Sequence, residues 1–306
     1  MPDVLASKLT VEHAREVVRS EQAALQEMRS VYREARLGLL GRLAQSRAES
    51  FTAQGYRVTL AQVQKSLAEL ERKLRRQGRD RVVSSYERGV AETLEQIAFW
   101  ESARGFKFGA HGRIQQRALR RVMKGVLLDR YETSVQAYGT ELIAQVQRRL
   151  GVHLAMRSKW TDMATDIAGR LGRHQIQGAR WKAERIVRTE MIHALNAGHK
   201  ASLEQAATVL PGLQQQWDAF LDARTCPICI GLEGQVQEVG APFHWGGGAF
   251  LQPPDPHPSC RCTLIPWRQE WAGLLAKHGA PHPGNPKPLP PPKPLKSKPA
   301  PLPAKG

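Results

Sequence analysis

Five residues that could bind a metal ion lie within a 37-residue window near the end of the chain. They form two short motifs, Cys226-Pro-Ile-Cys229 and, after 27 intervening residues, His257-Pro-Ser-Cys260-Arg-Cys262. A spacing of two residues lets one tight turn offer two side chains to the same ion, and zinc prefers four thiolate or imidazole ligands in a tetrahedron. The spacing therefore predicts a closed structural zinc site made by four of these five residues.

Other interpretations of the cysteines stay open. The thiols could remain reduced without a metal, or a disulfide bond could join the two motifs. A catalytic zinc with an open position would need a general base, and Glu233, Glu238 and Asp255 are the acids closest in sequence. A secreted disulfide scaffold would spread its cysteines over the whole fold. Because all four lie in one window, we favour a metal site in a reducing compartment.

A second polar group lies in a segment typical of a helix. Arg188, Thr189 and Glu190 are followed by His193 and Asn196, and steps of three residues could place Glu190, His193 and Asn196 on one face. In an enzyme, Arg188, Glu190 and Asn196 could form a centre for ADP-ribosyl transfer or nucleic-acid hydrolysis. No second carboxylate accompanies them. We favour an ion-paired helix and assign no catalytic residue.

The chain is strongly basic, with 45 Lys and Arg against 28 Asp and Glu and a formal net charge of +17. Residues 1–125 contribute +10 (24 basic, 14 acidic) and residues 126–208 contribute +4 (12 and 8). Residues 209–278 contribute −2 (4 and 6), and residues 279–306 contribute +5 (5 and 0). This excess favours a polyanion as partner, bound by the helical part and the tail.

One group of basic residues has helical spacing: Arg113, Arg117, Arg120, Arg121 and Lys124. The steps of four, three, one and three residues keep them on one helix face, where they could follow a row of phosphates. The alternative is an ordinary solvated helix face. We predict that the stripe binds phosphates or an acidic partner, and no base-reading motif supports sequence-specific recognition.

Hydrophobic periodicity predicts the fold class. Apolar residues recur at steps of three and four through much of the first 208 residues, for example at Leu60, Val63 and Leu67, which predicts long amphipathic helices. Frequent Pro and Gly after residue 211 predict a loop-rich knob with short strands, tied by Cys and His. The expected fold is mainly α with a small α+β C-terminal module.

Changes in composition divide the chain into four parts. We expect a long-helix N-terminal region at 1–108, a second helical region at 109–208, a Cys/His module at 209–278 and a disordered tail at 279–306. The tail holds 11 prolines and five lysines without an acid, a composition typical of an extended chain. No apolar run is long enough for a membrane span, so we expect no membrane partner.

Together these motifs resemble those of the phage Mu F-like minor head proteins, also called the phage head morphogenesis domain. The resemblance extends over residues 115 to 266, about half of the chain. It rests on Arg188-Thr189-Glu190 with Asn196 and Gly198, on Trp217, Asp222 and Arg224 before the first cysteine pair, and on Pro254 with His257-Pro-Ser-Cys260-Arg-Cys262. One departure is an extra residue before His257.

The resemblance implies a minor virion protein of a tailed phage or prophage, without established catalysis. Such a protein would assist head assembly at the portal and touch the packaged genome. Its expected partners are the portal protein, capsid or scaffold proteins and non-specific double-stranded DNA. The expected locations are the virion head and, during assembly, the host cytoplasm.

Overall fold

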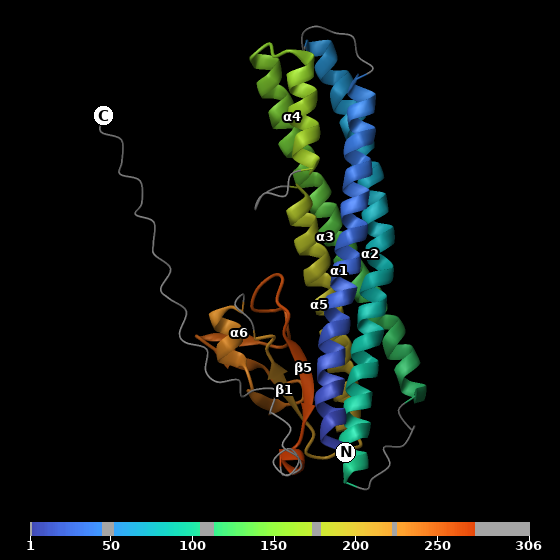
Figure 1. Cartoon of the computed structure of the whole chain (residues 1–306), viewed down its shortest axis with the longest axis vertical. Helices are drawn as coiled ribbons and strands as arrows, with labels where there is room; N and C mark the ends of the chain where they lie inside the picture. The colour runs from blue at the N-terminus through green and yellow to red at the C-terminus, as the bar shows by residue number, and fades with distance from the viewer. Residues whose placement is uncertain (1, 45–51, 105–112, 173–178, 222–224, 273–306) are drawn as a thin grey trace, which may run out of the picture.

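The computed structural model describes residues 2–44, 52–104, 113–172, 179–221 and 225–272. It shows a long helical bundle with a small module against its side (Figure 1). The helices are α1 (Pro2–Ala44), α2 (Ala53–Ala103), α3 (Arg113–Ala155), α4 (Trp160–Gly172), α5 (Ala179–Ala207) and α6 (Pro227–Leu232). The strands are β1 (Gln214–Asp218), β2 (Val236–Glu238), β3 (Phe243–Trp245), β4 (Gly248–Phe250) and β5 (Thr263–Trp267).

The bundle is built on the predicted apolar stripes. Helices α1, α2, α3 and α5 run along the long axis, and α4 packs on α1 at the end farthest from the module (Figure 1). In α2, Val63, Leu67 and Leu70 are all buried in one core that also takes residues from α1, α3, α4 and α5. Thr52 caps α2, because its Oγ1 accepts a hydrogen bond from Gly55 N at 3.1 Å. The predicted mainly α fold is confirmed.

Two glycines allow α2 and α5 to approach closely. A Cβ atom at Gly89 would lie 2.0 Å from the carbonyl oxygen of Leu195, and one at Gly198 would lie 2.2 Å from that of Tyr86. Both contacts are with backbone, which cannot move aside as a side chain can. The crossing places α5, and with it the module, at a fixed position against α2.

Replacing Gly198 by Ala is therefore expected to destabilise the protein by about 1–3 kcal/mol, the usual cost of overpacking. Gly125→Ala in α3 is the matched control, because nothing lies within 4 Å of its added Cβ. Alanine there should stabilise the helix by about 0.5–1 kcal/mol. Denaturant unfolding of both variants tests this, and equal stability of the two would contradict the close crossing.

The module is a small antiparallel structure beside α5. Its main sheet has the strand order β2-β1-β5, and β3 and β4 form a separate hairpin. Trp217, Phe243 and Leu264 form its core together with three of the cysteines and Ile97 from α2. The predicted α+β character of the C-terminal module is confirmed.

The end of the module is anchored on the last turn of α2. Arg268 Nη1 donates to Glu101 Oε1 at 2.9 Å, and Trp271 Nε1 donates to the same oxygen at 3.2 Å. The Trp271 ring also stacks on Trp100 with centroids 6.1 Å apart. Since Glu101 and Arg268 are both buried, this ion pair lies inside the contact between module and bundle.

The expected boundary near residue 108 and the tail at 279–306 lie outside the described residues. Helix α3 begins at Arg113 and packs along α2, so one core extends across the two helical parts. The division into four parts stays a prediction. None of the described helices has both the length and the apolar character that a membrane crossing requires.

Candidate metal site

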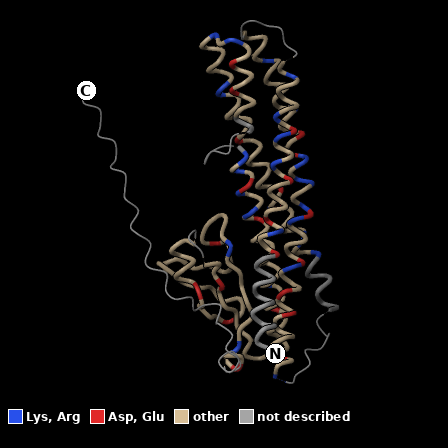
Figure 2. Tube along the Cα trace, viewed as in Figure 1, with Lys and Arg blue, Asp and Glu red and all other residues tan. Residues whose placement is uncertain are grey.

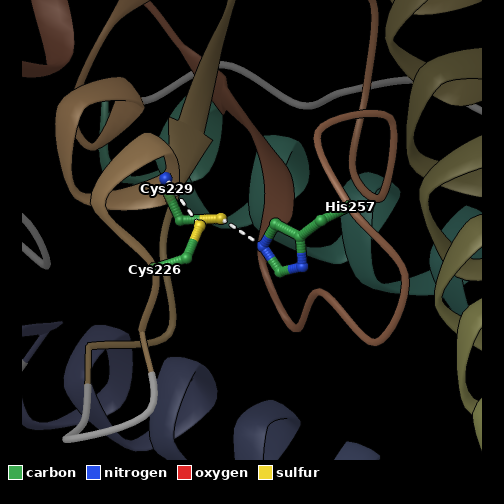
Figure 3. Close-up of side chains that lie close together, drawn as sticks. All are labelled: Cys226, Cys229 and His257. Atoms are coloured by element: carbon green, nitrogen blue, oxygen red, sulfur yellow. Dashed lines mark hydrogen bonds between the residues drawn. The ribbon is translucent and has the colours of Figure 1, made fainter. Parts of the chain in front are cut away.

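The first cysteine motif forms the start of a short helix. Cys226 is the N-cap of α6, and its Sγ accepts a hydrogen bond from Cys229 N at 3.3 Å. Pro227 follows at the first helical position, where its missing N–H costs nothing. The turn directs both sulfur atoms to the same side, toward His257 (Figure 3). The spacing of two residues thus produces the geometry that we expected.

His257 presents one ring nitrogen to this sulfur pair. Its Nε2 lies 3.2 Å from Cys229 Sγ, and its Nδ1 lies 2.9 Å from the carbonyl oxygen of Pro258. A carbonyl can only accept, so Nδ1 carries the proton and Nε2 keeps its lone pair in the neutral ring. Histidines that bind metals commonly have this orientation.

The five candidate ligands form two overlapping groups of three: Cys226, Cys229 and His257 in one, and Cys229, Cys260 and Cys262 in the other. Within each group, the ligand atoms all lie within 4.8 Å of one another. The Sγ atoms of Cys229 and Cys260 are 3.7 Å apart, and two thiolates on one tetrahedral zinc lie about 3.8 Å apart. Soft donors at this separation fit a zinc ion.

The cluster is well shielded from water. Cys229, Cys260 and Cys262 are each 2% exposed, while Cys226 and His257 are half-buried. Hydrogen bonding with Cys229 lowers the pKa of Cys260, and the same contact raises the pKa of Cys229. One thiol therefore ionises readily and discourages ionisation of its neighbour. A divalent cation would relieve this repulsion and allow several thiolates at once.

Two half-buried carboxyl groups lie near Cys262. Burial raises the pKa of Asp218 to about 7 and that of Glu233 to about 8, and the Cys262 thiol adds to both shifts. Glu233 accepts a hydrogen bond from Ala219 N. Asp255 accepts from the backbone N–H groups of Leu251 and Gln252 at 3.0 and 3.1 Å. The contacts of Glu233 and Asp255 stabilise the surrounding loops.

The structure does not bring the polar residues of α5 together. Arg188 pairs with Glu21 of α1 at 2.6 Å. Glu190 accepts from Arg130 Nε at 2.8 Å and from Ser134 Oγ at 3.1 Å, both in α3.

Asn196 instead faces the module, where it bonds to the backbone of β5 and the residue before it. Arg188, Glu190 and Asn196, which could have formed a catalytic centre, therefore contact α1, α3 and the module respectively. This separation favours a structural role for each. The sequence analysis assigned no role to Thr189. In the structure, its Oγ1 accepts a hydrogen bond from Ser259 N at 3.0 Å.

The basic stripe of α3 is described in part. Lys124 forms an ion pair with Glu87 of α2, and Arg121 is exposed. Arg113, Arg117 and Arg120 lie in the first turns of α3, and their side chains are outside the described residues. Lys and Arg occur at many positions along the bundle (Figure 2).

The sequence matches the family described as Phage Mu protein F like protein over residues 113–265, which is half of the chain. The chain belongs to this family. The resemblance inferred from the motifs is thereby confirmed, and the Mu F-like protein is a phage head morphogenesis protein. Its matched part begins with α3 and ends in β5, so it includes α5 and all five candidate ligands. No curated protein and no solved structure matches the chain.

Proposed function

We propose that this Mu F-like protein is a minor component of a tailed-phage head that assists assembly at the portal. The family match carries the proposal. The form of the molecule supports it, because a long bundle with a module on one side offers separate surfaces to separate partners (Figure 1). The partners proposed are the portal protein and capsid or scaffold proteins, and the locations are the virion head and the host cytoplasm during assembly.

Exposed apolar side chains on α3 support contacts with other proteins. Val122 and Val126 are 63% and 55% exposed, and Met156, just after α3, is 72% exposed. Val122 and Val126 are one helical turn apart, beside the basic stripe. The adjacent pair Val122 and Val126 is the part of this set that a partner could cover together, whereas Met156 lies at the opposite end of the helix.

An in-frame deletion of the gene tests the assembly role. We expect fewer infectious particles, restored by the wild-type gene in trans. In purified wild-type heads, the protein should be present at far fewer copies than the major capsid protein. A normal yield after deletion, together with absence of the protein from purified heads, would contradict the proposal.

The second part of the proposal is a non-specific contact with packaged double-stranded DNA. The net charge of +17 supports it, because each phosphate neutralised by Lys or Arg releases condensed counterions. We expect DNA affinity to fall steeply as salt rises. Replacing Arg113, Arg117, Arg120 and Arg121 by Gln should reduce the slope of log affinity against log salt by about 0.9 for each phosphate that is no longer neutralised.

The control for this measurement removes the same charge elsewhere on the bundle. Arg57, Lys65, Arg72 and Arg76 of α2 are exposed, and their replacement by Gln also lowers the net charge by four. If the α3 stripe forms the contact, this control keeps the wild-type slope. Equal slopes for the two variants would show that the stripe is not the contact.

The third part is a structural zinc ion. Four of Cys226, Cys229, His257, Cys260 and Cys262 would hold it, and their soft donors and mutual distances support this assignment. Bound there, zinc would cross-link the start of α6 to the loop before β5. The module has a small core, so such a link would stabilise it appreciably.

A further inference from the structure

We infer that Thr189 and Asn196 of α5 are positioning residues of the metal site, and that metal binding is thereby coupled to docking of the module on the bundle. The inference rests on the proposed zinc site. Thr189 and Asn196 are seven residues apart, so they lie almost directly above one another on α5. Thr189 bonds to the backbone of Ser259, just before Cys260. Asn196 bonds to the backbone of Cys262 and Leu264, just after it.

Asn196 acts on the segment that carries Cys262. Its Nδ2 donates to Cys262 O at 3.1 Å, and its Oδ1 accepts from Leu264 N at 2.9 Å. The side chain thereby pairs with β5 as a neighbouring strand would. It is fully buried, so no water can replace it. Loss of the amide would leave two backbone groups unsatisfied in the interior.

Thr189 acts on the residue before Cys260. Its Oγ1 accepts from Ser259 N at 3.0 Å, and Ser259 has φ of 62°, in the left-handed region that non-glycine residues rarely adopt. This conformation sets the direction in which Cys260 leaves the loop. The hydrogen bond to α5 therefore fixes the orientation of a candidate ligand.

His193 completes this face of α5 between the two positioning residues. Its Nε2 lies 3.3 Å from Gln252 Nε2. Burial lowers the pKa of His193 to about 4, so the neutral ring accepts a hydrogen bond from the Gln252 amide. One stripe of α5 thus contacts the loop ahead of the ligands and the ligand segment itself. Zinc would cross-link that segment to α6, on the far side of the module from α5 (Figure 1).

The experiment compares the zinc affinity of the full-length protein with that of Thr189→Val and Asn196→Leu, by competition with a chromophoric chelator. Loss of a group that orients a ligand typically lowers metal affinity by about 10- to 100-fold, and we expect this for both variants. Ser202→Ala is the control, because Ser202 is buried on α5 but donates to Val90 O of α2. Its zinc affinity should equal that of the wild type.

A second measurement needs no variant. In wild-type protein, removal of zinc should speed amide hydrogen exchange at Ser259 and Leu264, whose N–H groups bond to Thr189 and Asn196. Exchange in the core of α2 should not change. This measurement still decides the inference if Asn196→Leu fails to fold.

The outcomes separate the inference from the proposals on which it rests. If the wild type binds zinc, but Thr189→Val binds it equally well and exchange at Ser259 and Leu264 is unaffected, the coupling is wrong and the zinc site stands. If the wild type binds no zinc, the zinc site and the coupling are both wrong. The role in head assembly is tested separately by deletion of the gene.

Discussion

Replacing Cys229 by Ser is expected to lower zinc affinity by more than about 100-fold and to unfold the C-terminal module, while the helices of the bundle stay folded. Cys229 is the one candidate that belongs to both groups of ligands within the described residues. Without its sulfur, Cys226 with His257 and Cys260 with Cys262 remain as two separate pairs. One of the two ligands at the start of α6 is then missing, and it is the one shared by both groups.

Two signals report the effect in the same sample. Far-ultraviolet circular dichroism follows the bundle, and tryptophan fluorescence is weighted toward the module, which holds four of the seven tryptophans, including the fully buried Trp217. We expect the fluorescence transition of Cys229→Ser to shift to lower temperature, with little change in helix content. A variant that binds zinc as tightly as the wild type would contradict the central place of Cys229.

Cys226→Ser and Cys262→Ser are the matched comparisons, because each lies in one group only. A closed tetrahedral site uses four ligands, so one of the five candidates contributes nothing to the coordination. The variant that keeps wild-type affinity identifies that residue. A weaker affinity in both cysteine variants would leave His257 or Cys260 as the candidate outside the site.

Replacing Arg268 by Met is expected to destabilise the docked module by about 3–5 kcal/mol. The side chains of Glu101 and Arg268 are 5% and 10% exposed, so the change leaves a carboxylate buried beside its more distant partner Arg104, at 3.5 Å. Arg268 Nη2 also donates to Pro211 O at 3.0 Å, which would lose this partner. Denaturant unfolding, followed by fluorescence, measures the decrease in stability.

The double variant Glu101→Gln with Arg268→Met distinguishes an unpaired charge from weakened packing. Glutamine removes the buried charge and still offers an oxygen to Trp271 Nε1, which bonds to Glu101 at 3.2 Å in the wild type. We expect the double variant to be more stable than Arg268→Met alone. Equal stability of the two would show that packing of the arginine, and not its charge, holds the module.

Periodicity predicted the helices well because burial repeats with the turn of the helix. It could not predict which neighbour each polar residue of α5 contacts. Three residues advance a helix by about 300°, so each step falls about 60° short of a full turn, and Glu190 and Asn196 are about 120° apart. They therefore contact α3 and the module respectively. The seven-residue step from Thr189 to Asn196 falls only about 20° short, and that spacing was the signal missed.

At the cysteine site, too, the sequence predicted the local geometry but not the long-range contacts. Local spacing predicted the turn at Cys226 and Cys229, because the N-cap geometry depends on adjacent residues. The return of His257 to Cys229 depends on how β1 pairs with β2 and β5, which no local pattern contains. The Arg268 to Glu101 ion pair joins residues 167 positions apart. Neither residue has a sequence signature that marks it as an anchor.

The most direct test of the metal site is the zinc content of the full-length protein, purified under reducing conditions without added metal. We predict one zinc ion per chain, slow reaction of the four thiols with a thiol reagent, and both faster reaction and a lower melting temperature of the module after chelation. Protein that contains no zinc, with thiols and melting temperature indifferent to chelator, would contradict the account.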